Sequence, residues 1–325
     1  VIIVPTKYYT TPTDIFIEQG FAAIIWANHL MRSALRAMQD TARQIYQEQT
    51  LINVEDNIVS VAEVFRIQGE DELAEAEKLY LPAGTGNFQT IILAASRGQE
   101  LGDLTAARPK CMVDIKGKPL LAHIADAMRS IGIKDLVCVR GYAKESVNLT
   151  SIRYFDNDEF ESTQEVYSLY CARSSLQGNV IICYGDVLFK KYIPQELADL
   201  EEDFVIAVDA DWQTSRNRNR VADFITATEP NSRSAFYHSV YLQKIPAPEG
   251  AIHGEWMGFL RLSDRGCQVV KEILEELPPV ELRRNKIPDL LGHLLHRGEK
   301  IRLVYSTGHW LDVDSVDDVV AASRF

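Results

Sequence analysis

The chain has 325 residues, of which 46% are hydrophobic and 25% charged, with a formal net charge of −12. This composition is ordinary for a globular protein, and the length allows two domains. The negative charge argues against a nucleic-acid partner, whose phosphates would be repelled. The sequence has no apolar run near the roughly 20 residues that span a bilayer, and its five cysteines form no Cys-x-x-Cys pair. We therefore expect a cytoplasmic protein with reduced thiols and no membrane partner.

The first 80 residues combine short apolar runs with longer helical patterns. The patterns predict strands at 1–4 and 22–26 and helices after Thr13-Asp14, at 28–48, at 60–67 and at 70–79. A strand or two with several helices cannot cover its own apolar faces. Another layer or another subunit must therefore cover them.

Proline and glycine interrupt the periodicity at residues 81–88, which we interpret as an interdomain linker. Residues 89–325 then alternate strand and helix patterns, which is typical of a mostly parallel sheet with crossover helices. Strands are predicted at 89–95, 135–140, 179–184, 204–209 and 301–305, and helices at 118–131, 165–176, 263–275 and 286–296. Residues 213–235 are polar and aperiodic, and a solvated excursion explains them more simply than an ordered substrate lid.

Two aspartates come shortly after apolar runs of this second part. Asp186 follows the run 180–182, and Asp312 follows the run 301–305. Open α/β sheets bind their ligands at the carboxyl ends of the strands, and carboxylate oxygens are the ligands that Mg²⁺ prefers. We therefore predict a magnesium site at Asp186, Asp312 and Asp314. The acidic stretch could instead be the first turn of a helix, and we keep that interpretation for Asp317 and Asp318.

A turn of small residues precedes the first of these aspartates. The apolar run 91–95 leads into Ser96-Arg97-Gly98, and Lys110 follows a proline a few residues later. The N–H groups of such a turn can bind an anion. Lys110 is either a cation beside a phosphate or a surface lysine. The turn, the lysine and the two strand-end carboxylates together favour magnesium–nucleotide chemistry.

The same residues resemble a known family. The stretch Leu93-Ala94-Ala95-Ser96-Arg97-Gly98-Gln99-Glu100, then Pro109-Lys110 and Gly117-Lys118-Pro119-Leu120, resembles the opening of sugar-nucleotide-type nucleotidyltransferases. The resemblance covers the whole of residues 89–325 and is closest to cytidylyltransferases that act on phosphocholine and phosphonates. It implies an α/β fold with a mostly parallel, Rossmann-like sheet. Ser96 replaces the family's first glycine and Glu100 its phosphate-binding arginine, and Arg97 could supply the missing charge.

The resemblance also implies roles for particular residues. Lys110, Arg97 and Asp186 would be catalytic, and Mg²⁺ the cofactor. Glu255 and Trp256, with Asp209, could receive an acceptor's ammonium group by ion pairing and cation–π contact, although a structural role for Glu255 and Trp256 fits equally well. The predicted nucleotide-binding residues are Ala94, Ala95, Ser96, Arg97, Gly98, Lys110, Gly141, Thr163, Glu165, Ser168 and Asp186.

The N-terminal part has a resemblance of its own. Val4-Pro5-Thr6-Lys7-Tyr8-Tyr9, Ile25-Trp26-Ala27-Asn28-His29 and Asn53-Val54-Glu55-Asp56 resemble the end of phosphoenolpyruvate mutase. That family is an (α/β)₈ barrel with a terminal helix exchanged between subunits. Residues 1–80 are therefore expected to be the C-terminal remnant of an incomplete mutase barrel. The strands that carry the family's catalytic aspartates are absent from this sequence, so the resemblance implies ancestry and homo-oligomer contacts rather than mutase activity.

A mutase-like segment joined to a cytidylyltransferase-like domain is characteristic of phosphonate biosynthesis. The leading hypothesis is Mg²⁺-dependent transfer of CMP from CTP to a small phosphonate, such as 2-aminoethylphosphonate or 2-hydroxyethylphosphonate, with release of pyrophosphate. One alternative is a phosphoenolpyruvate mutase in a longer parent protein. Another is a non-catalytic nucleotide-binding or oligomerisation module, which Glu100 favours.

Overall fold

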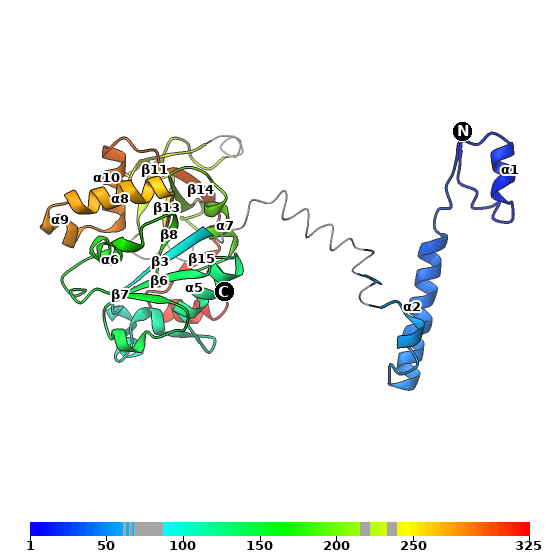
Figure 1. Ribbon diagram of the computed structural model, residues 1–325, viewed down its shortest axis with the longest axis horizontal. Coiled ribbons are helices and arrows are strands. Elements are labelled where there is room, and N and C mark those ends of the chain that lie inside the picture. Colours follow the sequence, from blue (N-terminus) through cyan, green and yellow to red (C-terminus); the bar gives the residue numbers. More distant parts are fainter. Residues whose placement is uncertain (61–62, 65–66, 68–86, 215–221, 233–238) are drawn as a thin grey trace. The chain divides into compact units, whose positions relative to one another are not determined.

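The computed structural model describes residues 1–60, 63–64, 67, 87–214, 222–232 and 239–325. The chain divides into two compact units, Val1–Leu81 and Pro82–Phe325 (Figure 1). Most of the predicted linker at 81–88 and of the predicted helices at 60–67 and 70–79 lies outside the described residues. Those predictions remain untested.

The first unit contains the two predicted strands and the long helix. Strand β1 (Ile2–Ile3) pairs in parallel with β2 (Ala23–Ile24), and helices α1 (Thr13–Glu18) and α2 (His29–Glu48) follow β1 and β2. Phe16 of α1 is buried and packs its ring edge-on against Phe21. In contrast, α2 buries none of its 20 residues.

The second unit is built on a nine-stranded sheet. Six strands form parallel pairs and run in one direction, and β13 runs antiparallel between β8 and β10. These six are β7 (Arg153–Asp156), β6 (Asp135–Arg140), β3 (Phe88–Ala94), β8 (Asn179–Tyr184), β10 (Phe204–Asp209) and β14 (Arg302–Ser306). Five of the six match the predicted strands, and β7 was not predicted.

The three strands of this sheet that form only antiparallel pairs were also not predicted. They are β13 (Gly254–Leu262), β11 (Phe224–Ala227) and β12 (Leu242–Lys244). Strand β11 lies within the stretch 213–235 that we interpreted as a solvated excursion, so that interpretation is wrong for residues 224–227. The antiparallel pairing with β13 gives the short apolar run around Ile225 a buried place in the sheet.

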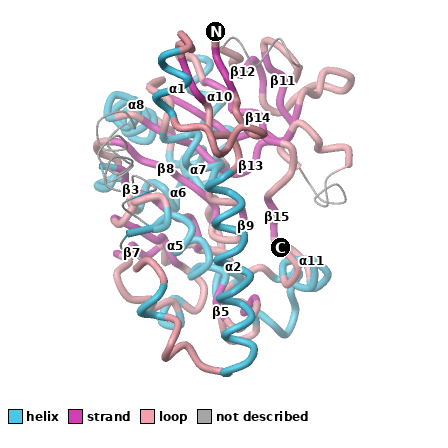
Figure 2. Tube along the Cα trace, turned by 90° about the vertical axis from the view of Figure 1, so that its right-hand side faces the viewer, coloured by secondary structure: helices cyan, strands magenta, loops and turns pink. Residues whose placement is uncertain are grey.

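Helices cover both faces of the sheet (Figure 2). One apolar cluster joins the sheet to α6 (Glu165–Cys171), α8 (Asp264–Glu276) and α10 (Ile287–His296). The other joins it to α5 (Leu120–Ser130) and α7 (Tyr192–Ala198). Helix α6 is shorter than predicted, because the chain turns into a 3₁₀ segment at Arg173–Ser175. Two shorter helices, α9 (Pro279–Arg284) and α11 (Val316–Ala322), complete the unit.

The sheet brings several chain segments to one edge. Because β3 and β8 are parallel neighbours, the residues after Ala94 and after Tyr184 leave the sheet side by side. Strand β13 runs the opposite way, so its first residues, from Gly254, lie at this same edge beside Asp209. In the described part of the chain no helix is long and apolar enough to cross a membrane.

Candidate nucleotide- and metal-binding site

The small-residue turn follows β3 and is held by the segment that carries Lys110. Gly98 has a φ of +73°, and a Cβ there would lie 2.8 Å from the Lys110 Cβ, so both the backbone angle and the space require glycine. The Lys110 N–H donates to the Arg97 carbonyl (3.1 Å), and the Thr105 hydroxyl donates to the Gly98 carbonyl (2.9 Å). Ser96 is not among the residues with positive φ. It therefore replaces the family's glycine without backbone strain.

The three predicted metal ligands converge, because a short antiparallel ladder sets their spacing. Strand β15 (Trp310–Asp312) pairs with β9 (Val187–Phe189) so that Asp312 lies opposite Val187, the residue after Asp186. Among the described residues, Asp186, Asp312 and Asp314 form the one cluster of potential ligands whose oxygens all lie within 4.8 Å of one another.

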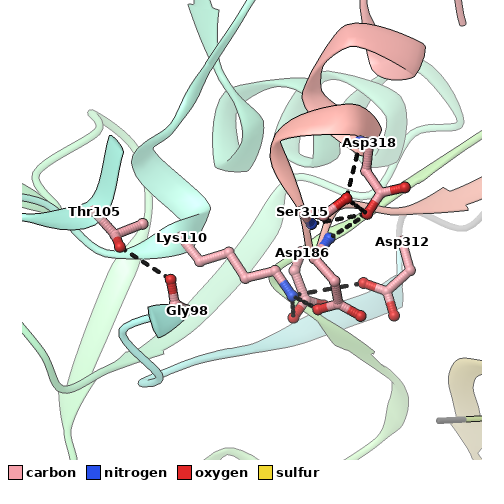
Figure 3. Close-up of polar contacts among 8 residues, drawn as sticks. Gly98, Thr105, Lys110, Asp186, Asp312, Ser315 and Asp318 are labelled. Atoms are coloured by element: carbon pink, nitrogen blue, oxygen red, sulfur yellow. Dashed lines mark hydrogen bonds and ion pairs between the residues drawn. The ribbon is translucent and has the colours of Figure 1, made fainter. Parts of the chain in front are cut away.

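Lys110 lies among these carboxylates (Figure 3). Its Nζ is 2.9 Å from Asp186 Oδ2 and 3.7 Å from Asp312 Oδ1, and it also forms an ion pair with Asp314. Burial alone would lower the pKa of Lys110, but the charges of the three aspartates outweigh burial and raise this pKa above its ordinary value. The ammonium is therefore charged at neutral pH, and it neutralises part of the negative cluster.

The carboxylates fit a divalent cation. Asp186 Oδ1 is buried and has no hydrogen-bond partner among the described residues. Converging carboxylate oxygens are the ligands that a hard ion such as Mg²⁺ requires. Asp318 has a different role, because its Oδ2 accepts hydrogen bonds from the N–H groups of Asp314 and Ser315 at the start of α11 (Figure 3). Asp317 and Asp318 both lie in the first turn of α11, as the sequence predicted.

A cleft of about 280 Å³ opens beside the carboxylates, close to the volume of many small-molecule sites. Of the predicted site residues, Ala95, Ser96, Thr163, Glu165, Ser168, Asp186, Asp312 and Asp314 line it. Ala94, Gly98 and Gly141 are not among its lining residues. A Cβ on Gly141 would lie 2.7 Å from the Ala95 carbonyl oxygen, so glycine is required for the close approach of these two loops.

Arg97 and Asp209 are also absent from the lining of the cleft, and both have contacts elsewhere. The Arg97 guanidinium lies over the Tyr142 ring, with 5.3 Å from Cζ to the ring centroid. Asp209 is fully buried and accepts hydrogen bonds from the Gly308 N–H and Trp310 Nε1, both 2.9 Å. Asp209 thus lines neither the cleft nor the smaller cavity beside it. Asp209 instead anchors the loop that leads into β15 and Asp312.

The far wall of the cleft is organised by a buried asparagine. Asn157 Nδ2 donates to Thr163 Oγ1 (3.0 Å) and to Ser168 Oγ (3.1 Å). Its Oδ1 accepts from the Glu159 N–H. Asn157 therefore fixes both hydroxyl groups that the sequence indicated. Hydroxyl groups held in this way are suited to form specific hydrogen bonds with a flat heterocycle.

Glu165 begins α6 and faces the cleft. Burial raises the pKa of Glu165, while a backbone hydrogen bond and the charge of Lys286 act in the opposite direction. Its Oε2 is buried and has no hydrogen-bond partner among the described residues. A carboxylate in this state is available to accept a hydrogen bond from a ligand.

A smaller cavity adjoins the cleft, and Glu255 and Trp256 line it together with Tyr184, Asp223 and Trp310. The Trp256 ring meets Tyr184 edge-on, with 5.4 Å between centroids, and its Nε1 donates to the Phe259 carbonyl. The sequence left open whether Trp256 has a structural role or contacts a ligand. In the structure, Trp256 both packs in the core and lines the cavity. Glu255 is 1% exposed at the start of β13.

Sequence reasoning missed several residues that line the cleft, namely Phe160, Gln164, Tyr184, Asp223 and Lys286. Gln164 lies between the predicted residues Thr163 and Glu165, and Tyr184 lies two residues before Asp186, so both could have been found from the same segments. Asp223 precedes the unpredicted strand β11, and Lys286 lies far from every motif in the sequence. These two residues could be found only from the fold.

The comparisons with known proteins agree with this fold. Residues 90–298 match the family described as MobA-like NTP transferase domain, and the chain belongs to this family. In fold, the chain is similar to the inositol-1-phosphate CTP transferase from T. maritima, with a TM-score of 0.58 and 17% identity over 71% of this chain and 90% of that one. The predicted nucleotidyltransferase fold is confirmed.

Three relatives bear on the two units. The chain is 57% identical over 81 residues to phosphoenolpyruvate phosphomutase of Tetrahymena pyriformis, covering 25% of this chain and 27% of the mutase. It is 26% identical to CTP:phosphoglutamine cytidylyltransferase of Campylobacter jejuni over 71% of this chain and 98% of that enzyme. It is also 29% identical to CMP-5'-(3-aminopropyl)phosphonate synthase of Streptomyces rubellomurinus, covering 37% of this chain and 20% of the synthase. The predicted mutase-like N-terminal segment is thus confirmed, and the chain spans only a small part of the mutase and the synthase.

Proposed function

We propose that the chain transfers CMP from CTP to a small phosphonate and releases pyrophosphate. The observation that carries the proposal is the convergence of Asp186, Asp312 and Asp314 around Lys110 at the edge of a polar cleft. Two relatives named for CTP or CMP chemistry support the cytidylyl group. The phosphonate acceptor is supported by the relative named for an aminopropylphosphonate and by the mutase-like N-terminal segment.

Different residues would contact the nucleotide and the acceptor. Main-chain N–H groups of the turn at 95–98 would bind phosphate oxygens, and the hydroxyls that Asn157 orients would contact the cytosine. An acceptor oxygen attacks the α-phosphorus, and the bond from this phosphorus to the pyrophosphate oxygen breaks. Because the acceptor oxygen is already ionised, no general base is needed. Catalysis is positioning and charge neutralisation, as in other phosphoryl-type transfers.

The aspartates would hold Mg²⁺, which when bound supplies positive charge that offsets the repulsion between two phosphorus oxyanions. Lys110 lies among the same carboxylates and adds a second positive charge at this point. The smaller cavity with Glu255, Asp223 and Trp256 would receive the far end of the acceptor. Its carboxylates and aromatic rings favour an ammonium group, and therefore 2-aminoethylphosphonate over 2-hydroxyethylphosphonate.

The direct test is a pyrophosphate-release screen that crosses the four nucleoside triphosphates with 2-aminoethylphosphonate, 2-hydroxyethylphosphonate and phosphocholine. We expect the fastest release with CTP and 2-aminoethylphosphonate in the presence of Mg²⁺. Pyrophosphate release with phosphocholine but with neither phosphonate would overturn the phosphonate assignment. Formation of phosphoenolpyruvate from phosphonopyruvate would instead support the mutase alternative.

We also propose that the first unit mediates self-association. Helix α2 buries none of its residues, and Leu30, Met31, Leu35 and Met38 all remain exposed. A closed symmetric oligomer is the common way to cover such an apolar face. The high identity to a mutase over this segment supports a face with a partner.

A further inference from the structure

The charges that line the cleft are unbalanced. Five carboxylates line it, from Glu165, Asp186, Asp223, Asp312 and Asp314. Within the described part of the chain, Lys286 is the one cation among the lining residues. A cleft of this charge repels the two phosphorus oxyanions that the proposed reaction must bring together. Each of them needs a positive group of its own.

The backbone around Lys286 is held firmly against the nucleotide wall. The Gln164 N–H donates to the Arg283 carbonyl (2.8 Å), and the Val166 N–H donates to the Asn285 carbonyl (3.2 Å). These bonds tie the loop between α9 and α10 to the first turn of α6, and α9 and α10 both contact α6 (Figure 1). The loop therefore places Lys286 at the rim of the cleft.

Within the described part of the chain, no ion pair of the Lys286 ammonium holds the fold together. Its backbone N–H starts α10 by donating to Asp289 Oδ2 (2.7 Å), whichever side chain is present. The residue is exposed, and within the described residues its ammonium forms no ion pair. The positive charge of Lys286 lowers the pKa of Glu165, and the negative charges of Asp186 and Asp223 raise this pKa. Lys286 lines the same cleft as Asp186 and Asp223.

The two other cations of the predicted site do not line the cleft. Lys110 is surrounded by three aspartates, and the Arg97 guanidinium lies on Tyr142. We propose that Lys286 binds the anionic phosphorus group of the acceptor and positions its oxygen for attack on the α-phosphorus. This inference rests on the proposed function. It assigns Lys286 as the residue that determines affinity for the acceptor oxyanion.

The step balances without another reactant. One oxygen of the acceptor phosphonate forms a bond to the α-phosphorus of CTP, and pyrophosphate leaves with the electrons of the broken bond. Lys286 keeps all its protons, because it acts only as a charged hydrogen-bond donor. The same geometry would serve a phosphate monoester, since the group it recognises is a tetrahedral oxyanion on phosphorus.

The test is Lys286→Gln in the full chain, with Lys286→Arg as the conservative variant. Pyrophosphate release is measured against 2-aminoethylphosphonate and, separately, phosphocholine, and CTP affinity is measured by calorimetry. We expect KM for the acceptor to rise about tenfold or more in Lys286→Gln, as for loss of one charged hydrogen bond. The dissociation constant of CTP should change less than about twofold, and Lys286→Arg should restore most of the acceptor affinity.

Arg284→Gln is the matched control, because Arg284 is exposed two residues away and does not line the cleft. It should behave like the wild type. Unchanged acceptor KM in Lys286→Gln, or an equal loss of CTP affinity, would overturn the assignment while leaving the proposed function intact. If the wild type turns over neither acceptor, the proposed function and this inference both fail.

Discussion

The Val313 N–H donates a hydrogen bond to the carbonyl oxygen of Asp186, with 3.0 Å between the two atoms. This bond continues the β9–β15 ladder and joins two segments that are more than 120 residues apart in the chain. Because main-chain bonds set the spacing, Asp312 and Asp314 approach Asp186 without depending on the side chains of either segment. The side chains at these positions can therefore be changed with little effect on the fold.

This independence makes the metal site testable by substitution. Asp186→Ala and Asp312→Ala should each leave a folded protein and lower turnover about a hundredfold or more, about 2.7 kcal/mol of barrier. Asp317→Ala should be near wild type, since Asp317 is exposed in the first turn of α11 and is not in the cluster. The measurement is pyrophosphate release with circular dichroism as the folding check. Near-normal turnover in a folded Asp186→Ala or Asp312→Ala variant would refute the assignment.

Lys110 and a divalent cation neutralise the same carboxylates. Lys110→Met removes the only described cation in contact with the cluster. In the absence of metal, the free energy of unfolding should therefore fall by about 2 kcal/mol. This loss is smaller than that for breaking a fully buried ion pair, because Asp186 and Asp314 are partly exposed. Mg²⁺ should then raise the melting temperature of the variant more than that of the wild type, because ligand binding to the native state stabilises it.

Thermal unfolding with and without Mg²⁺ measures both effects, and Lys116→Met on an exposed turn is a suitable control. A melting temperature of Lys110→Met equal to that of the wild type in the absence of Mg²⁺ would show that Lys110 does not neutralise the cluster.

The sequence predicts much of the fold and less of the site. Parallel strands such as β3 and β8 are recognisable because both faces are buried and the strands become continuous apolar runs. Strand β13 is equally buried, but Gly254, Glu255 and Gly258 interrupt its apolar run. The pattern therefore did not indicate a strand.

The residues of the site likewise divide into those that the sequence predicted and those that only the fold reveals. The carboxylates and the turn were predicted because each lies at the end of a recognisable strand or apolar run. Asn157 and Lys286 act through contacts that depend on how α6, α9 and α10 pack. The internal contacts of Asp209 were missed for a related reason, because only the fold shows that its partners come from residues 308–310.

Arg97 remains a predicted contact for the triphosphate. Glu100 is exposed and occupies the position where the resembled family has an arginine, so Arg97 is the cation available in this turn. Arg97→Ala should weaken CTP binding about tenfold, as for loss of one charged hydrogen bond. Glu100→Gln should keep or slightly improve it by removing a negative charge. Calorimetry that finds the wild-type affinity in Arg97→Ala would disprove the compensation.

The exposed face of α2 gives a prediction about assembly. Leu35 and Met38 are 48% and 57% exposed on α2. Leu35→Asp combined with Met38→Asp should convert the expected oligomer to a smaller species, because burying two carboxylates in an apolar interface is costly. Gln47→Asp, at an exposed polar position of the same helix, should not. Light scattering at tens of micromolar protein measures the oligomeric state of the wild type and the variants. A monomeric wild type would contradict the proposal that the first unit mediates self-association.

Glu165 should make stability depend on pH in a definite direction. Burial, partly opposed by a backbone hydrogen bond and Lys286, raises its pKa in the folded state. The native protein therefore holds this proton more tightly than the unfolded chain, and Glu165 lowers stability as pH rises through its folded-state pKa. Glu165→Gln removes that penalty. The melting temperature of the variant minus that of the wild type should be larger at about pH 8 than at about pH 5. Glu161→Gln, exposed just before α6, should show no such difference. A difference for Glu165→Gln that is the same at both pH values would contradict the buried, ionisable carboxylate assigned here.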